Sequence, residues 1–472
     1  MIVEAIQGSC ISWILGFGLS FLDKPVRAFS ILGFCGNVAL AEDDPIKPRS
    51  GDSTDGSGLE RIEDGSVVSN IHTSKWRVFT DSGREHFFQG KLEPAERLFG
   101  SAIQEAKEGF GERDPHVASA CNNLAELYRV KKEFDKAEPL YLEAVSILEE
   151  YYGPEDVRVG ATLHNLGQLY LVQRKLEEAR SCYERALKDN GQGESMTYIR
   201  RLRYLSQIYI RSNRLADAEN IHRKLLHMME LSKGWNSMET VIAAEALAVT
   251  LQLSGQLSEA QELFEKCLNT QKKLLPEGHI QIGGNFLHMA KTFMLQATQL
   301  RGTNNSEALS KLDKAKDYLG DSSRIAKDVL LKLKNQKGKE QKQGKSSETL
   351  RNYEHAALVI LTLSVSLQLR SLESLAVLET SKNEIPEAKE RDPHAAEDAL
   401  LQCLSAYKEF GCGSQLQDSP EVKTEYVTCL EHLSVLLANR ETMEASPISL
   451  AELKEEVKRI EMDLLGSHKK GS

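Results

Sequence analysis

The sequence predicts an all-α protein, an alpha-alpha superhelix in which pairs of helices stack along one axis and continue into more divergent C-terminal helical repeats. Three observations predict it. Short motifs centred on alanine return at a nearly constant interval along the chain. Within each interval, apolar residues recur at steps of three and four, which places them on one face of a helix. Ala, Leu, Glu and Lys are abundant, whereas only 12 prolines and 6% aromatic residues occur in 472, which favours helix over sheet.

The overall composition excludes some classes of protein. The chain carries 59 Lys+Arg against 69 Asp+Glu, a net charge of -10, whereas a protein that binds nucleic acid over its whole surface should be basic. With 41% hydrophobic and 27% charged residues, it is expected to be an ordinary soluble, folded chain. The eight cysteines are scattered without a C-x-x-C pair, so we expect reduced, inert thiols packed inside helices and no zinc or dithiol site.

Two apolar runs, 11–22 and 28–41, begin the chain, and each is shorter than the roughly 20 residues that cross a bilayer. No stable membrane span is therefore expected. The second run follows basic residues and ends in Ala39-Leu40-Ala41, the form that a signal peptidase accepts. We predict an apolar leader over 1–41 that acts as a transit peptide to an organelle (chloroplast or mitochondrion). The alternative is a membrane-leaning, poorly ordered leader, and without a transit peptide the protein is expected to be cytoplasmic. Residues 42–72, rich in Gly, Ser, Asp and Pro, are expected to be a disordered linker.

Two independent sets of residues share one period. The first set consists of alanines 42, 42, 39 and 42 residues apart, at Ala95, Ala137, Ala179, Ala218 and Ala260. The second set lies upstream and has intervals of 42, 39 and 42, at Leu124-Ala125, Leu166-Gly167, Leu205-Ser206 and Leu247-Ala248. Because chance does not give two sets the same spacing, the chain is a true repeat.

Each unit contains two helical patterns joined by a short turn. Small residues such as Ala125 or Gly167 in the first pattern, and Ala137 or Ala179 in the second, allow the two backbones to approach closely. We expect tyrosines to fill the gaps between adjacent units, at Tyr128, Tyr141, Tyr170 and Tyr183. A lone helix pair cannot bury this surface, so the units must stack.

The stretches 116–128, 137–144 and 161–170 resemble the tetratricopeptide repeat (TPR), in the 42-residue form found in kinesin light chains. Repeat 1 matches mainly in its second helix, repeat 4 departs at His222 and Leu225, and a sixth unit carries about six extra residues. The resemblance implies a TPR solenoid of about six repeats over 73–319, acting as a non-enzymatic protein-protein interaction scaffold or adaptor. In that family the first helices line a concave groove that binds extended peptides. Residues 1–70 lack the sustained heptads of a motor subunit.

Carried over residue by residue, the resemblance places peptide binding on the first helices of repeats 2, 3 and 4. The residues are Asn122, Asn123, Glu126, His164, Asn165, Gln168, Arg200, Arg203, Tyr204 and Gln207. Asparagine can pair with both amide groups of an extended peptide, and Arg200 and Arg203 share a face from which they can grip a carboxylate. We therefore expect a preference for acidic segments. The alternative is that the asparagines only connect helices and the arginines form a solvated face.

The C-terminal third is less regular. Residues 320–352 contain a Lys/Gln/Gly-rich run, 332–345, that we predict to be a solvated basic linker, with a docking or import motif as the alternative. Residues 353–467 are predicted to form divergent helical repeats that end in a polar capping helix. The expected helices are 353–380, 395–410, 422–440 and 450–465, with a linker over 383–393.

No catalytic motif is found, so we expect no enzyme, no catalytic residue, no metal and no cofactor. The expected partners are other proteins, bound through extended peptide segments, and not nucleic acid; the oligomeric state is left open. One alternative is an organellar assembly or biogenesis factor that uses the same groove. An enzyme hidden in the C-terminal third and an RNA-binding helical repeat are further alternatives, the last disfavoured by the 42-residue period and the acidic charge.

Overall fold

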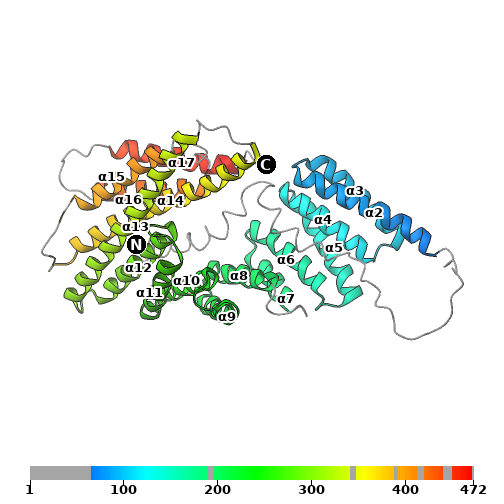
Figure 1. Ribbon diagram of the computed structural model, residues 1–472, viewed down its shortest axis with the longest axis horizontal. Helices are drawn as coiled ribbons and strands as arrows, with labels where there is room; N and C mark the ends of the chain where they lie inside the picture. Colours follow the sequence, from blue (N-terminus) through cyan, green and yellow to red (C-terminus); the bar gives the residue numbers. More distant parts are fainter. Residues whose placement is uncertain are drawn as a thin grey trace. The chain divides into compact units, whose positions relative to one another are not determined.

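The computed structural model describes residues 65–188, 196–340, 347–386, 388, 392, 394–411, 419–438 and 449–469. The elements in these ranges are helices and no strand occurs among them, which confirms the predicted fold class (Figure 1). The predicted leader, 1–41, lies outside the described residues, as does most of the predicted linker. Contacts divide the chain into two compact units, and the boundary between Ile221 and His222 falls inside a helix of repeat 4.

The N-terminal unit is a stack of antiparallel helix pairs. Within it, α2 packs on α3, α4 on α5 and α6 on α7, and each pair contacts the next through α3–α4, α5–α6 and α7–α8 (Figure 1). Its helices are α2 (Gly65–Phe88), α3 (Leu92–Phe110), α4 (Pro115–Val130), α5 (Phe134–Tyr152), α6 (Val157–Val172), α7 (Leu176–Ala186), α8 (Met196–Arg211) and the start of α9 (Leu215–Lys233).

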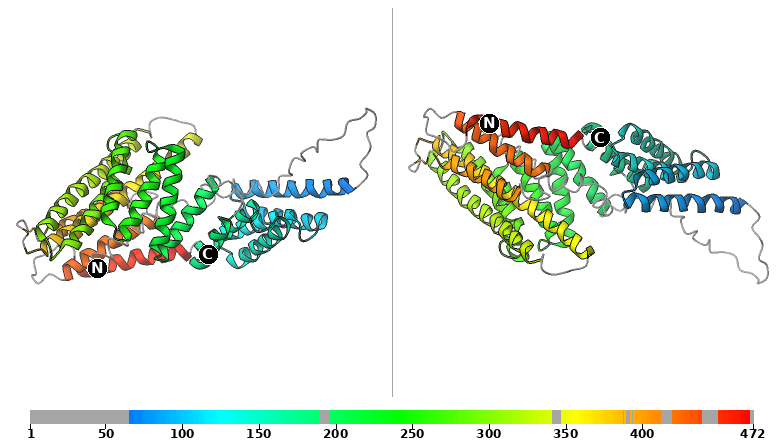
Figure 2. Two further views of the ribbon diagram at one scale, coloured as in Figure 1. Left: turned by 90° about the horizontal axis from the view of Figure 1, so that it is seen from below. Right: turned by 90° about the horizontal axis from the view of Figure 1, so that it is seen from above.

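The C-terminal unit continues the same scheme with longer helices. It pairs α10 with α11, α12 with α13, α14 with α15 and α16 with α17, and the last pair lies side by side in all views (Figures 1 and 2). Its helices after α9 are α10 (Met238–Leu253), α11 (Leu257–Leu274), α12 (Ile280–Leu300), α13 (Asn305–Glu340), α14 (Ser347–Asn383), α15 (Ala395–Ala406), a π-helical turn η3 (Tyr407–Gly411), α16 (Pro420–Ala438) and α17 (Leu450–Lys469).

The small residues lie at the helix contacts, as predicted. Ala125, Ala137 and Ala179 are fully buried. A Cβ atom added at Gly167 would lie 2.8 Å from Cε2 of Tyr183, so only glycine leaves room for this ring. The repeat period is therefore a period of close helix–helix contact.

The turn within each repeat is also periodic. A residue with positive φ ends the first helix of five successive units, at Gly90, Lys132, Arg174, Asn213 and Gly255. After each of these residues, the next backbone N–H donates to the carbonyl five residues before it, for example Glu133 N to Tyr128 O at 2.9 Å. This is the Schellman end of a helix, in which a left-handed residue reverses the chain. It explains why the two helices of a pair are antiparallel and joined by so few residues.

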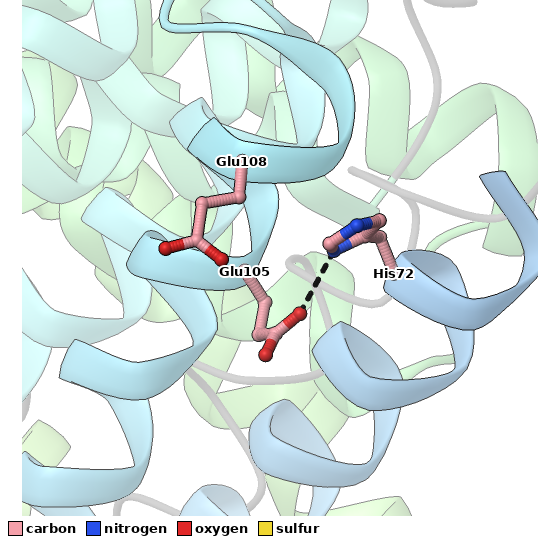
Figure 3. A group of neighbouring side chains, drawn as sticks. All are labelled: His72, Glu105 and Glu108. Carbon is pink, nitrogen blue, oxygen red and sulfur yellow. Dashed lines mark hydrogen bonds and ion pairs between the residues drawn. The ribbon is translucent and has the colours of Figure 1, made fainter. Parts of the chain in front are cut away.

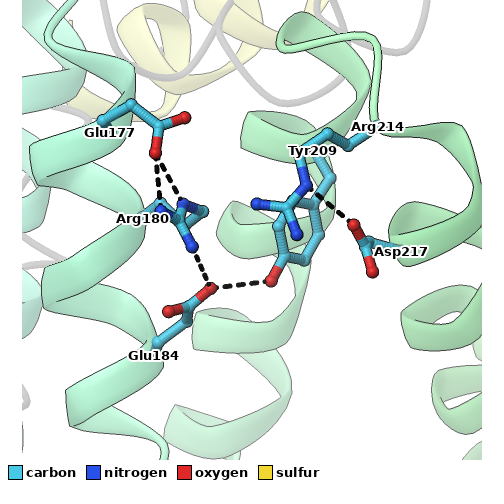
Figure 4. A network of polar contacts seen from close by, with 6 residues as sticks. All are labelled: Glu177, Arg180, Glu184, Tyr209, Arg214 and Asp217. Carbon is cyan, nitrogen blue, oxygen red and sulfur yellow. Dashed lines mark hydrogen bonds and ion pairs between the residues drawn. The ribbon is translucent and has the colours of Figure 1, made fainter.

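Tyrosines near the ends of first helices connect neighbouring repeats. The hydroxyl of Tyr128 donates to Glu96 at 2.9 Å, and that of Tyr170 donates to Glu138 at 3.0 Å, one period later. The next connection is built differently (Figure 4): the hydroxyl of Tyr209 donates to Glu184 at 2.8 Å. Three ion pairs flank this bond: Arg180 pairs with both Glu177 and Glu184, and Arg214, which lies over the Tyr209 ring, pairs with Asp217.

The structure corrects two predicted boundaries. Helix α2 begins at Gly65, inside the expected linker 42–72, and α13 continues to Glu340 through most of the run that we predicted to be a loop. Lys, Gln and Glu are good helix formers, so a helix that is already packed can extend through them without an apolar face. The four helices expected after residue 353 are present as α14–α17.

Two cysteines depart from the prediction of inert thiols. Cys403 in α15 and Cys429 in α16 form a disulfide with their Cα atoms 6.6 Å apart. In contrast, Cys121, Cys182 and Cys267 are buried free thiols, and burial raises the pKa of both Cys121 and Cys182 to about 12. The spacing of the paired cysteines, 26 residues, carries no known motif, because the bond depends on how α15 and α16 pack.

One described segment, Ile360–Asn383 in α14, is long and apolar enough to cross a membrane by length and composition. About two-thirds of it, 67%, is buried within the protein, and α14 contacts α13, α15 and α16. The same segment carries Arg370 and Glu373, both buried. These features are those of a central helix in a helical unit.

Candidate functional site

The predicted peptide-binding residues lie on α4, α6 and α8 of the N-terminal unit. The first two of these helices contact each other directly, and the amide nitrogen of Asn165 in α6 donates to Asn122 Oδ1 in α4 at 3.1 Å. The side chain of His164 in α6 meets the ring of Tyr204 in α8, with centroids 5.4 Å apart. First helices of three successive repeats thus form one wall, which we call the α4–α6–α8 wall.

Unpaired amide donors occupy the α4 part of the wall. Asn122 and Asn123 are 0% and 1% exposed, and within the described part of the chain the Nδ2 atom of each has no hydrogen-bond acceptor. Leaving a buried donor without a partner costs about 1–3 kcal/mol. A carbonyl or carboxylate oxygen placed here would remove that cost.

Glu126 differs from its neighbours because the protein itself satisfies its carboxylate. Arg129 Nε donates to it at 2.9 Å, and the hydroxyl of Tyr141 donates to the same oxygen at 2.7 Å. Both partners are buried. Glu126 therefore holds Arg129 in place, and its negative charge is balanced at short range.

His164 forms the centre of the wall and is neutral. Burial, followed by the positive charges of Arg201, Arg200 and Arg129, lowers the pKa of its imidazole to about 3. The amide nitrogen of Gln168 lies 2.9 Å from His164 Nε2, so this ring nitrogen accepts and Nδ1 carries the proton. Nδ1 is buried and has no partner among the described residues, which makes it a third unused donor.

An aromatic surface lies beside this histidine. The rings of Tyr183 and Tyr204 stack with centroids 5.4 Å apart, and His164 meets both rings edge-on. Tyr183 is fully buried, whereas Tyr204 and Gln207 are partly exposed. This rigid group fixes the positions of the polar atoms around it.

Arginines supply the charge at the α8 end. Arg203 is exposed and Arg200 is partly exposed. Arg201 is buried and donates to the carbonyl of Ala186. The positive charges of Arg200 and Arg203 repel each other, so an anion that binds between them stabilises both.

The structure thus brings most of the predicted residues together and adds two that the sequence analysis did not include. Arg129 and Arg201 both contribute positive charge near His164. Each has a signal in the sequence, since Arg129 lies three residues after Glu126 and Arg201 follows Arg200. Their importance depends on burial, which the sequence pattern did not show.

Family models match several of the repeats. Models described as tetratricopeptide repeat match residues 116–189, residues 240–281, and residues 80–151 with 164–224. These parts of the chain are tetratricopeptide repeats. Repeats of this family bind other proteins or peptides and are generally non-catalytic, so the TPR fold of this chain is that of an interaction scaffold. A search of curated proteins finds no match.

Several solved structures share parts of the helical arrangement at low similarity. Nearly identical TPR-like repeats from Podosopora anserina, described as a kinesin light chain, are 19% identical, cover 44% of this chain and 97% of their own, and give a TM-score of 0.38. BtubC from P. vanneervenii is 22% identical over 48% of this chain and 90% of its own, with a TM-score of 0.36. YrrB, a TPR protein with an unusual peptide-binding site, is 21% identical over 47% and 91%, with a TM-score of 0.32. The family assignment rests on the repeat models, and the kinesin light chain-like form stays a resemblance.

Proposed function

We propose that this TPR protein is a non-enzymatic adaptor that holds an extended, acidic peptide segment of another protein against the α4–α6–α8 wall. The observation that carries the proposal is the accessible, positively charged α8 end of the wall, where Arg203 is exposed and Arg200, Tyr204 and Gln207 are partly exposed. Such a surface offers hydrogen-bond donors and positive charge to a ligand rich in acceptor oxygens.

The three parts of the wall have different roles in this proposal. The asparagines of α4 are buried in the unbound wall; they bind backbone carbonyls, which every extended peptide presents, once the side chains around them move aside, and so contribute affinity without sequence preference. Arg200 and Arg203 select acidic side chains, because a guanidinium binds a carboxylate with two parallel hydrogen bonds. Tyr204 and Gln207, both partly exposed, contact the peptide between these two parts. Glu126 acts indirectly by fixing Arg129.

A binding experiment tests the proposal on the full chain. Fluorescence anisotropy would compare an extended Glu/Asp-rich peptide with the same peptide in which every carboxylate is an amide. A charge-assisted hydrogen bond contributes about 1.5–3 kcal/mol, so Arg203→Glu should weaken binding of the acidic peptide at least about tenfold. Asn123→Ala should weaken both peptides, since it removes a donor to the backbone.

The matched control is Arg97→Glu, which makes the same charge change at an exposed position of α3. It should leave the affinity within about twofold of the wild type. Equal losses in Arg97→Glu and Arg203→Glu would mean that only net charge matters. Equal affinity of the wild type for the acidic and the amidated peptide would overturn the acidic preference.

The organellar form of this function, an assembly or biogenesis factor that uses the same wall, depends on residues 1–41. These lie outside the described residues, so a transit peptide remains a prediction from the sequence. Sequencing the N-terminus of the protein from cells tests it: a start at Glu42 supports cleavage after Ala41, and a start at Met1 contradicts it.

A further inference from the structure

A histidine and two carboxylates meet between the first two helices, away from the α4–α6–α8 wall. His72 lies on α2, while Glu105 and Glu108 lie three residues apart on α3, and the Glu105 carboxylate points toward His72 (Figure 3). One ligand atom from each of the three residues lies within 4.8 Å of the others. Among the described residues, this is the one group of at least three such side chains that comes this close.

Close helix packing holds His72 in this position. A Cβ atom added at Gly109 would lie only 2.3 Å from the Cβ of His72, so α2 reaches α3 through the missing side chain of a glycine. The histidine side chain is partly buried as a result. Its ring is therefore brought against α3 by the backbone contact and not by the carboxylates alone.

The two oxygens of Glu105 have separate partners. Oε2 lies 2.9 Å from His72 Nδ1, and Oε1 lies 3.2 Å from the ammonium group of Lys75. Lys75 can therefore remain on Oε1 while Oε2 binds another ligand.

We propose that His72, Glu105 and Glu108 form a binding site for a divalent transition-metal ion of the Zn²⁺ type. Zinc binds histidine nitrogen at about 2.0–2.1 Å and carboxylate oxygen at about 2.0–2.2 Å, which puts neighbouring ligand atoms about 3 Å apart, close to the separation of His72 Nδ1 and Glu105 Oε2. The ion takes the place of the shared proton, and the exposed Glu108 closes on it. A ligand set of one imidazole and two carboxylates favours Zn²⁺ over Mg²⁺ or Ca²⁺, which prefer oxygen alone.

The bound ion would connect α2 to α3, and Lys75 would act as the outer partner that orients the Glu105 carboxylate. An ion that bridges two helices strengthens their contact and slows local opening. The site therefore acts as a clamp on the first helix pair of the solenoid, independent of peptide binding at the wall. Solvent fills the remaining coordination positions, since Glu108 is exposed.

Calorimetric titration of the full chain with Zn²⁺ tests the site, together with the visible spectrum of the Co²⁺-loaded chain. Loss of outer partners alone weakens metal sites by about 10–100-fold, so Glu108→Gln and His72→Gln should each weaken binding at least about tenfold. Glu108→Gln changes an exposed side chain and should fold normally. The matched controls are Glu112→Gln and His227→Gln, which change exposed residues of the same types elsewhere and should bind Zn²⁺ as the wild type does.

Hydrogen exchange gives a second, structural readout. Zn²⁺ should slow amide exchange in α2 of the wild type and have no such effect in Glu108→Gln. The proposal is wrong if the wild type does not bind one equivalent of Zn²⁺ at micromolar protein concentration, or if both site variants bind it unchanged. A Co²⁺ spectrum dominated by thiolate charge-transfer bands would also overturn it, because it would place the ion at cysteines.

Discussion

Replacing Glu245 by glutamine should stabilise the C-terminal unit at alkaline pH and change it little in acid. Glu245 lies on α10 and is 9% exposed. Its Oε1 accepts from the Gln271 amide at 2.7 Å and from the Asn285 amide at 3.4 Å. No described cation pairs with this carboxylate. Its negative charge is therefore buried with only two neutral donors to stabilise it.

The magnitude follows from the pKa. Burial raises the pKa of Glu245 from 4.5 to about 7, although the hydrogen bonds from Gln271 and Asn285 oppose the shift. The folded state then holds the Glu245 proton more tightly than the unfolded state does. The contribution of this residue to the free energy of unfolding is therefore fully present below about pH 4.5 and is lost as the pH rises through about 7. At about 1.4 kcal/mol for each pH unit between the two values, ionised Glu245 costs about 3 kcal/mol at pH 8.

Tryptophan fluorescence can report this unit alone. Trp235 packs beside Val241, Ala244 and Cys267, close to Glu245 in the sequence. A background with Trp13→Phe and Trp76→Phe leaves Trp235 as the one tryptophan of three. Urea unfolding at pH 5, 6, 7 and 8 then compares Glu245→Gln with its parent.

The parent should lose about 2–3 kcal/mol between pH 5 and pH 8 relative to Glu245→Gln, since part of the full loss has already occurred at pH 5. The control is Glu239→Gln, an exposed carboxylate on the same helix, which should follow the parent at every pH. If Glu245→Gln shows the parent's pH slope, or is less stable than the parent at pH 8, then burial does not set the charge of this residue.

The pH dependence that arises from His164 has the opposite sign. The pKa of His164 is lowered to about 3, so the free energy of unfolding of the N-terminal unit should fall by about 2 kcal/mol from pH 8 to pH 5, because the unfolded chain takes up the proton. His164→Gln should abolish this loss in denaturant titrations, and an unchanged slope would contradict the neutral state. Gly167→Ala, with its Cβ 2.8 Å from a ring carbon, should destabilise by about 1–3 kcal/mol. Gly100→Ala, which meets nothing within 4 Å, should stabilise by up to about 1 kcal/mol in the same thermal scans, so a loss of equal size there would refute the packing argument. Removing the Cys403–Cys429 disulfide by two serine substitutions should cost about 3 kcal/mol for a separation of 26 residues, and a thermal midpoint insensitive to both substitution and reductant would contradict the bond.

The fold was predictable because every repeat carries the same local pattern of small and apolar residues. The spacing of Ala137 and Ala179, and of Leu124 and Leu166, is enough to predict the helix pairs and the small residues at their contacts. The prediction of a linker over 320–352 was wrong for most of its length. It was based on the lack of an apolar face in the run of Lys and Gln, but α13 begins in a packed segment and extends through much of that run. Periodicity shows which face a helix buries, and it does not show how far the helix continues.

The candidate site was predictable in its residue positions but not in its chemistry. Asn122 and Asn165 were chosen as peptide contacts, and the structure also joins them by a hydrogen bond. Glu126 was chosen for its position on the wall, whereas its carboxylate is held by Arg129 and Tyr141. These differences arise because hydrogen bonding depends on side-chain partners that lie between 3 and 43 residues away, and a family pattern contains no such information.

The sequence by itself determined that this chain is a repeat of antiparallel helix pairs, because period, small residues and turn residues are local properties. Only the tertiary structure decided which distant side chains meet. His72 reaches Glu105 across 33 residues, and Cys403 bonds Cys429 because α15 and α16 lie side by side. Such pairings depend on the rotation and separation of whole helices, to which every contact in the stack contributes, and so they cannot be read from the spacing of any one segment.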